Sequence, residues 1–235
     1  LLEALGFEAL ATTSAGFAQA LGKLDGSVTL EEKIEHCRAL ATATDIPVSA
    51  DLENGFADEP EEAARTLLLA AEAGVVGGSI EDYSGTEIYE FELAVARVRA
   101  AVKAVRSLDF PFTLTARAEN LLRGRNDLAD TIRRLQAYAE AGADVLYAPA
   151  LKSLDEVREI SRAVDKPLNV LGPFIPGASF TDLAAAGAQR VSIGGALADA
   201  AIGATLKAGR EMLDRGSFGW LADMAPYAEI KRLLQ

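Results

Sequence analysis

The feature that most constrains the fold is a regular alternation of two kinds of strand start along the chain. In one kind, a glycine ends a helical stretch and a strand follows at once, because glycine suits the left-handed position that ends a helix. In the other, a proline opens the strand, where its missing N–H is not yet needed by the sheet. The glycine starts are Leu5-Gly6-Phe7, Ala73-Gly74-Val75, Ala141-Gly142-Ala143 and Ala186-Gly187-Ala188, and the proline starts are Ile46-Pro47-Val48, Phe110-Pro111-Phe112 and Lys166-Pro167-Leu168.

Each start leads into a short apolar run, and stretches with helical periodicity separate the runs. Strands that alternate with helices in this way predict a parallel sheet. Runs that are almost wholly apolar predict strands covered on both faces. The predicted strands are Ala9–Ser14, Val48–Glu53, Val76–Glu81, Phe112–Glu119, Val145–Ala148, Leu168–Leu171 and Val191–Ile193.

This alternation predicts an α/β fold, a (β/α)8 TIM-type barrel, with residues 1–235 as a single domain. A closed barrel of this kind takes eight strands. Because seven are visible, the alternation also predicts a first strand that precedes residue 1. The alternative is an open, doubly wound sheet of seven strands. Residues 197–235 are expected to form a C-terminal helical extension, which suits packing on a neighbouring subunit or a simple cap.

The composition argues against several classes of protein. The net charge is −12 and no basic patch is visible, which argues against nucleic-acid binding. Cys37 is the only cysteine and His36 the only histidine, so neither a disulfide framework nor a multi-histidine metal site is available. No apolar run is long enough to cross a membrane, and no signal peptide is visible. We therefore expect a cytoplasmic enzyme.

Acidic residues stand at the ends of two neighbouring predicted strands, where barrel enzymes place their active sites. Alternation along the strand predicts that Asp51 and Glu53 share one face, and Glu81 ends the next strand. A bound cation would relieve their mutual repulsion, and oxygen ligands favour Mg²⁺, with Mn²⁺ as an alternative. The other interpretation is a solvated pair of surface acids. Asp82 is expected to point away from Glu81 and to support the site or cap a helix.

Arg117 and Glu119 share a face at the end of the following strand. An arginine beside such acids suits a bidentate grip on a substrate carboxylate or phosphoryl group. A buried ion pair of Arg117 with Glu119 or Glu81 is the structural alternative, and both roles can hold at once.

Residues in three further parts of the chain are candidates. Ser14, Ala15 and Gly16 stand at the end of the first visible strand, and their small side chains let backbone N–H groups approach a ligand. Asn169 is a polar residue within an apolar strand and needs a partner. Asp25 is a lone acid on the loop beyond Gly16.

Taken together, these segments resemble the isocitrate lyase/phosphoenolpyruvate mutase superfamily. Each segment alone is a weak signal, but their order and spacing are specific, and the resemblance runs along essentially the whole chain. The segments are Thr12-Thr13-Ser14-Ala15-Gly16-Phe17, Leu24-Asp25-Gly26, Pro47-Val48-Ser49-Ala50-Asp51-Leu52-Glu53-Asn54-Gly55, Gly78-Ser79-Ile80-Glu81-Asp82 and Thr115-Ala116-Arg117-Ala118-Glu119-Asn120.

The resemblance implies an Mg²⁺-dependent lyase that acts on small 2-oxo or 2-hydroxy carboxylates through an enolate-like intermediate. It implies that Asp51, Glu53 and Glu81 serve the metal and that Arg117 binds the substrate. Ser14, Ala15 and Gly16 would contact the substrate carboxylate, with Asp25 nearby. A homo-oligomer, a dimer or tetramer that exchanges a C-terminal helix, is implied as well.

Two departures from the family pattern leave the reaction open. Family lyases carry a Lys-x-Cys-Gly-His loop after the strand of Glu81, whereas residues 82–88 hold no Lys, Cys or His. Tyr83 and Tyr89 are the only nearby proton donors that the sequence offers. Isocitrate-type lyases bind the second carboxylate of their substrate with a glutamate and a threonine. The corresponding positions here are Pro149 and Leu171, while Asn169 is retained. The alternatives are P–C bond chemistry on phosphonopyruvate, by a mutase or a hydrolase, and a catalytically impaired keto-acid-binding protein.

Overall fold

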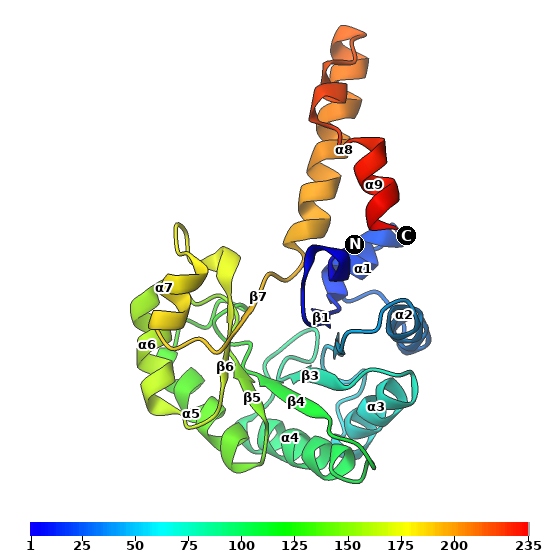
Figure 1. The fold of residues 1–235 in the computed structure, drawn as a ribbon. Helices are drawn as coiled ribbons and strands as arrows, with labels where there is room; N and C mark the ends of the chain where they lie inside the picture. The colour runs from blue at the N-terminus through cyan, green and yellow to red at the C-terminus, as the bar shows by residue number, and fades with distance from the viewer. Residues whose placement is uncertain (235) are drawn as a thin grey trace.

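The computed structural model describes residues 1–234, and their strands form one parallel sheet of seven (Figure 1). The strands follow each other across the sheet in chain order. They are β1 (Leu10–Ala11), β2 (Val48–Asp51), β3 (Gly77–Glu81), β4 (Thr113–Arg117), β5 (Val145–Tyr147), β6 (Leu168–Leu171) and β7 (Arg190–Ser192). A doubly wound sheet reverses its strand order at a switch point. This sheet does not, so the barrel-type α/β fold is confirmed and the doubly wound alternative is wrong.

Helices follow the strands and range around the outside of the curled sheet (Figure 1). They are α1 (Ser14–Ala20), α2 (Leu30–Thr42), α3 (Pro60–Glu72), α4 (Phe91–Val105), α5 (Leu128–Glu140), α6 (Leu154–Ala163), α7 (Phe180–Ala185), α8 (Ala196–Arg215) and α9 (Tyr227–Leu233), with the short 3₁₀ helices η1 (Glu3–Leu5), η2 (Gly172–Phe174) and η3 (Gly219–Asp223).

Local sequence sets where these elements begin and end. Gly6, Gly74, Gly142 and Gly187 have φ angles of 95°, 101°, 105° and 109°. This confirms the left-handed conformation predicted for the glycine strand starts, which a side chain would strain. At the opposite end of a helix, Thr29 begins α2 through a reciprocal pair of hydrogen bonds with Glu32, a capping box.

The two faces of the sheet differ in chemistry. The convex face carries apolar side chains such as Ala50, Ile80 and Leu114, which are buried in the hydrophobic core against the helices. Arg190 donates to Thr115 at 3.3 Å although β7 and β4 are not neighbours, so these side chains meet across the concave face. The strands are largely buried, as predicted, but much of their concave face is polar. Alternation along each strand therefore separates the core from the site.

The C-terminal arm, residues 196–234, stands away from the sheet (Figure 1). Helix α8 projects outward and α9 folds back along it, and neither helix contains a buried residue. At the base of the arm, Gln19 of α1 donates to Asp199 of α8 at 2.9 Å. Within residues 1–234, no helix combines the length and apolar character needed to cross a membrane.

Candidate active site

Arg117 lies at the centre of a group of buried and half-buried acids at the carboxyl ends of β2, β3 and β4. Its Nη1 donates to Asp51 Oδ1 at 2.9 Å, and its Nη2 lies 3.0 Å from Glu81 Oε2. Nη2 and Nε donate to Glu119 Oε1 at 2.7 and 3.1 Å. We call these four residues the Arg117 cluster. The ion pairs of Arg117 with Glu81 and Glu119, one of the two interpretations of the sequence, are therefore present.

The strand register explains why these residues meet. Glu81 and Arg117 are direct neighbours across β3 and β4. Arg117 and Asp51 lie on strands separated by β3, so their contact, like that of Arg190 and Thr115, crosses the concave face. Glu119 lies two residues beyond Arg117, where the Ala118 N–H still donates to the Tyr147 carbonyl, and its side chain returns to Arg117. Neighbouring parallel strands that end at one level bring together acids that are far apart in the sequence.

Burial and charge oppose each other within the cluster. Burial raises the pKa of Glu81 to about 8. Arg117 lowers this pKa, but repulsion from Glu119 and Asp51 raises it again and offsets part of that effect. Burial also disfavours ionised Asp51, but Arg117, Lys33 and backbone N–H donors hold its pKa below the usual value. The acids therefore differ in charge state, and Glu81 is the one with least compensation.

Glu53 lies in the turn after β2 and not, as predicted, within the strand. Strand β2 ends at Asp51, and Glu53 has a φ of 52° in the turn beyond it, so strand alternation does not place it on the face of Asp51. Its carboxylate instead lies 3.7 Å from Lys33 Nζ. Burial raises the pKa of Glu53, Lys33 opposes this shift, and Asp51 and Asp25 add to it. Asp25, on its exposed loop, is thus near enough to influence Glu53.

Lys33 is a site residue that the sequence interpretation missed. It belongs to α2, and its side chain is fully buried. Lys33 and Cys37 are the buried residues of this helix, and their spacing of four places them on one stripe. A lysine on the buried stripe of a helix is the signal that could have identified it, because a buried ammonium needs a compensating charge.

The carboxylate oxygens of Asp51, Glu53 and Glu81 fit a hard cation. Among residues 1–234, no three His, Cys, Asp or Glu side chains are arranged as a metal-binding group, and Asp51, Glu81 and Glu53 face Arg117 or Lys33. Their donors are all oxygens, which suit Mg²⁺ or Mn²⁺. Within the same residues, Glu53 Oε1 and Glu119 Oε2 are buried without a hydrogen-bond partner. Buried carboxylate oxygens of this kind favour a cation nearby.

Asp82 supports the cluster from behind, one of the two roles expected for it. Its carboxylate accepts from the backbone N–H of Glu119 at 2.7 Å, from the Tyr138 hydroxyl at 2.6 Å and from Arg134 Nη1 at 3.0 Å. All of these groups are buried. Asp82 therefore fixes the backbone from which Glu119 reaches Arg117.

Ser14, Ala15 and Gly16 lie beside Asp51, but they belong to the first turn of α1 and not to a strand, since β1 ends at Ala11. The Ser14 N–H donates to Asp51 Oδ2 at 3.2 Å. A Cβ on Gly16 would come within 2.7 Å of the Thr13 side chain, so only glycine fits there without a shift. The segment thus provides backbone at the edge of the cluster.

Asn169 and Tyr147 continue the concave face beyond Arg117. Asn169 donates to Ser192 Oγ at 2.9 Å, and its Oδ1 is buried with no partner among residues 1–234. Tyr147, which the sequence interpretation missed, holds its ring centroid 5.2 Å from the Arg117 guanidinium carbon. Leu171 is buried and apolar, so it offers no side-chain hydrogen bond to a ligand.

The loop after β3 is a compact turn. Tyr83 forms an isolated bridge with Ile88, and its hydroxyl donates to the Gly85 carbonyl at 2.8 Å. The Tyr89 hydroxyl instead contacts Asn54 and Asp58, and burial together with Asp58 raises its pKa to about 12. Of the two tyrosines considered as proton donors, Tyr83 is therefore the one that is not engaged in a side-chain network.

Arg123, from the loop between β4 and α5, also reaches the cluster and was missed. Its Nη2 lies 3.2 Å from Glu119 Oε2 and 3.5 Å from Glu81 Oε1. Its guanidinium carbon stacks 3.9 Å from the Tyr83 ring centroid. The spacing of four from Glu119 is a helical-turn spacing, but the sequence alone does not show that the chain turns there.

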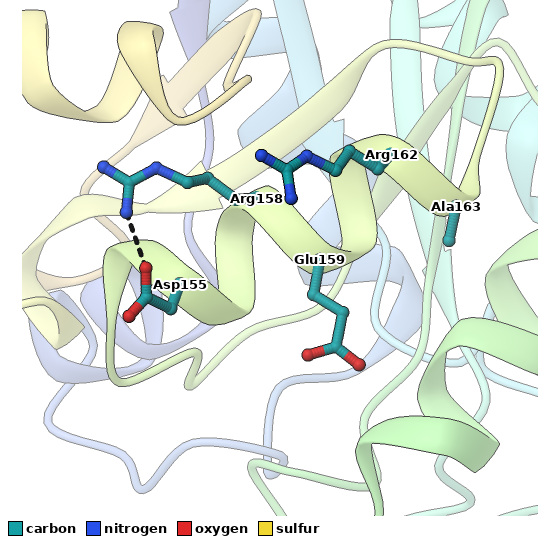
Figure 2. A pocket seen from close by; sticks show the side chains of 5 residues that line it. All are labelled: Asp155, Arg158, Glu159, Arg162 and Ala163. Carbon is teal, nitrogen blue, oxygen red and sulfur yellow. Dashed lines mark hydrogen bonds and ion pairs between the residues drawn. The ribbon is translucent and has the colours of Figure 1, made fainter.

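A separate depression lies on the surface of α6 (Figure 2). It is lined by Asp155, Arg158, Glu159, Arg162 and Ala163, and Arg158 donates to Asp155 at 2.6 Å. These are side chains of one surface helix, and none belongs to the Arg117 cluster. We assign no function to this depression.

Known proteins resemble the chain along most of its length. The phosphoenolpyruvate phosphomutase family model matches residues 1–213. A "Probable 2-methylisocitrate lyase 2" of Corynebacterium glutamicum is 35% identical over 177 residues, which cover 71% of this chain and 56% of that protein. The chain therefore spans just over half the length of this lyase.

Solved structures show the same relationship. A "putative lyase/mutase" of Burkholderia cenocepacia J2315 is 52% identical, with a TM-score of 0.95, covering 98% of this chain and 84% of that one. A 2,3-dimethylmalate lyase, a PEP mutase/isocitrate lyase superfamily member, is 26% identical, with a TM-score of 0.85, covering 100% and 84%. The predicted resemblance and the predicted enzyme class are thus confirmed, and the chain belongs to the phosphoenolpyruvate phosphomutase family, within a superfamily of lyases and mutases that act on small carboxylates.

Proposed function

We propose that this protein is an Mg²⁺-dependent carbon–carbon lyase, or a decarboxylase, that acts on a small 2-oxo or 2-hydroxy carboxylate. The observation that carries the proposal is the burial of Arg117 against acids from three separate segments. A structural ion pair needs a single partner. An arginine shared by several acids at the carboxyl ends of barrel strands is typical of a site that holds an anion and a cation together.

Asp51, Glu53 and Glu81 are the residues that would hold Mg²⁺, with Mn²⁺ as an alternative, directly or through water. When bound, the cation would supply a Lewis acid at the oxygen on C2 of the substrate. Arg117 would bind the substrate carboxylate, and Glu119 would orient Arg117. The backbone at Ser14, Ala15 and Gly16 and the free Oδ1 of Asn169 would contact the remaining oxygens.

Negative charge develops on the substrate as the bond breaks and an enolate-like species forms. Arg117 would stabilise this charge electrostatically, because its guanidinium is already held in place by Asp51 and Glu119. We propose Tyr83 as the proton donor to the product carbanion, since its ring stacks on Arg123, which pairs with Glu81 and Glu119 of the cluster. Asp25 is the second proton-transferring candidate, near Glu53.

The proposal is tested by turnover of a panel of 2-oxo and 2-hydroxy acids with and without Mg²⁺. We expect cleavage of at least one member with Mg²⁺, a loss of 100-fold or more for Arg117→Lys, on the order of a lost bidentate contact together with its orientation, and a smaller loss for Tyr83→Phe. Binding of oxalate or pyruvate with no turnover of any member would instead identify a keto-acid-binding protein.

P–C bond chemistry on phosphonopyruvate is a second candidate, and Arg123 is the observation that favours it. The loop at residues 82–88 supplies no basic side chain, but Arg123 brings a guanidinium to the same edge of the cluster. Release of inorganic phosphate from phosphonopyruvate, or conversion to phosphoenolpyruvate, would select this reaction over the lyase.

We also propose a homo-oligomer, a dimer or tetramer, in which the C-terminal arm packs on a second copy. The arm exposes Leu206, Leu213, Phe218 and Tyr227, and such apolar patches mark interaction surfaces. A groove between α1 and α2, lined in part by Phe17, Leu21, Leu30 and Ile34, is an apolar surface of the barrel that could receive it. The mass of the protein in solution tests this arrangement.

A further inference from the structure

Arg123 is a second guanidinium at the cluster, and the lyase mechanism proposed above gives it no contact with the substrate. It comes from the loop between β4 and α5 and stacks on Tyr83 of the turn after β3. Its side chain is 36% exposed, whereas that of Arg117 is 12% exposed. Arg123 is therefore more accessible to a ligand from solvent than Arg117.

The Arg123 guanidinium is held in orientation but keeps its donors available. It stacks on the ring of Tyr83, and the Tyr83 hydroxyl is fixed to the Gly85 carbonyl. Such stacking sets the plane of a guanidinium without using its N–H groups. Its side chain forms ion pairs with Glu81 and Glu119, yet among residues 1–234 it donates no side-chain hydrogen bond. Arg117, in contrast, donates hydrogen bonds to two acids.

The charge balance leaves room for an anion at this position. Asp51, Glu53, Glu81 and Glu119 face Arg117, Lys33 and Arg123. With all of these groups ionised, the carboxylates exceed the cations by one. A divalent cation would reverse that excess, and a cation on Glu81 would compete with Arg123 for this carboxylate. Arg123 would then have N–H groups free to face a bound substrate.

We propose that Arg123 selects substrates that carry a second anionic group, a carboxylate or a phosphonyl group, in addition to the 2-oxo or 2-hydroxy acid end. This inference rests on the function proposed above and adds the substrate class to it. A guanidinium matches both groups because each presents two oxygens to its paired N–H donors.

Two matched pairs of ligands test the proposal by calorimetric titration in the presence of Mg²⁺. Malate differs from lactate by one carboxylate, and phosphonopyruvate differs from pyruvate by one phosphonyl group. We expect the wild-type protein to bind at least one dianion about 10-fold or more tighter than its monoanionic partner, in line with a charge-assisted hydrogen bond. Arg123→Gln should abolish this preference and change the affinity for lactate and pyruvate by less than about threefold. Arg123→Lys should restore part of it.

Arg125→Gln is the matched control. Arg125 lies in the same loop, and its guanidinium pairs with Asp130 at 3.3 Å, so the variant removes the same charge outside the cluster. It should keep the wild-type preference. A loss confined to one ligand pair identifies the second group as a carboxylate or as a phosphonyl group.

Two results overturn the inference while leaving the proposed function intact. One is an equal loss of lactate and malate affinity in Arg123→Gln, which would place Arg123 at the shared acid end. The other is an unchanged preference in this variant. If the wild-type protein binds none of the four ligands with Mg²⁺, the proposed function itself fails, and the inference fails with it.

Discussion

In the Arg117 cluster, charged side chains lie buried beside one another, whereas in the C-terminal arm large apolar side chains lie exposed. The side chain of Glu119 is 0% exposed and that of Glu81 is 7% exposed, while Leu213 is 89% exposed. Burying charge is costly unless each charge is compensated. Exposing apolar surface leaves its burial free energy unused. The cluster is compensated mainly within the chain, whereas residues 1–234 leave the apolar side chains of the arm uncovered.

Removing Arg117 should have the largest effect on stability, because the acids of the cluster then lose the cation that compensates them. Arg117→Ala leaves three buried carboxylates without their shared cation, and we expect a loss of about 3–5 kcal/mol in the free energy of unfolding. Urea denaturation at neutral pH without added metal measures it. Arg158→Ala is the control, because Arg158 pairs with the exposed Asp155 on α6, and an exposed pair contributes at most about 1 kcal/mol. Equal losses in the two variants would contradict the assignment of Arg117 as the centre of the cluster.

The stability of the metal-free protein should fall as the pH rises from about 5 to 8. The native protein keeps a proton on Glu81 up to its pKa of about 8, while the unfolded chain loses that proton near the ordinary value of 4.5. Between these values the native state binds more protons, so the free energy of unfolding decreases with pH, by at most about 1.4 kcal/mol per pH unit. Above pH 8 this contribution is lost in full.

Urea denaturation across this pH range, with Glu81→Gln as the comparison, measures the effect. The glutamine variant should remove most of the slope, and Mg²⁺ should flatten it in the wild-type protein by favouring the ionised acid. A slope that persists in Glu81→Gln would assign the titration to another group.

Lys33 and Glu53 should prove to be coupled. Lys33→Met leaves Glu53 without its cation and should cost about 1–2 kcal/mol, less than Arg117→Ala because the pair is 3.7 Å apart and makes no hydrogen bond. The double variant Lys33→Met/Glu53→Gln should recover most of this loss. Arg38→Met, on the exposed side of the same helix, is the matched control. Additive losses in the double variant would show that the two residues act independently.

The smallest effect on folding should come from the arm. Leu213→Asp replaces a side chain that contacts little of its own chain. In dilute protein, the free energy of unfolding should therefore change by less than about 0.5 kcal/mol. The mass in solution, measured by light scattering, should nevertheless decrease. Thr205→Asp, on the same helix and also exposed, adds the same charge without removing an apolar contact and should retain the wild-type mass. An unchanged mass in Leu213→Asp would remove this part of α8 from the interface.

Most of the framework was predictable because it depends on local rules. The alternating strand starts predicted a parallel barrel-type sheet, and the four glycines have the left-handed conformation expected of them. Asp51, Glu81, Arg117 and Glu119 converge because parallel strands end at one edge, a consequence of topology that follows once the strands are identified. Their roles toward metal and substrate remain predictions.

The errors arose where the chain leaves regular structure. Alternation placed Glu53 beside Asp51, but β2 ends before Glu53 and a turn directs its side chain toward Lys33. Ser14, Ala15 and Gly16 start a helix where a strand end was expected. Side chains alternate between the two faces of a sheet only while the backbone stays extended. The sequence does not mark the residue at which the extended backbone ends.

The sequence by itself thus determined the order of strands and helices and the acids at three strand ends, because hydrophobic periodicity and the backbone preferences of glycine and proline act over a few residues. The tertiary structure alone decided which cations meet these acids. Lys33, which meets Glu53, comes from a helix. Arg123 reaches the Arg117 cluster from a loop and Tyr147 from another strand, and no local pattern connects these positions. The compensation of buried charge is a property of the whole fold, because it depends on distance in space and on exclusion of water.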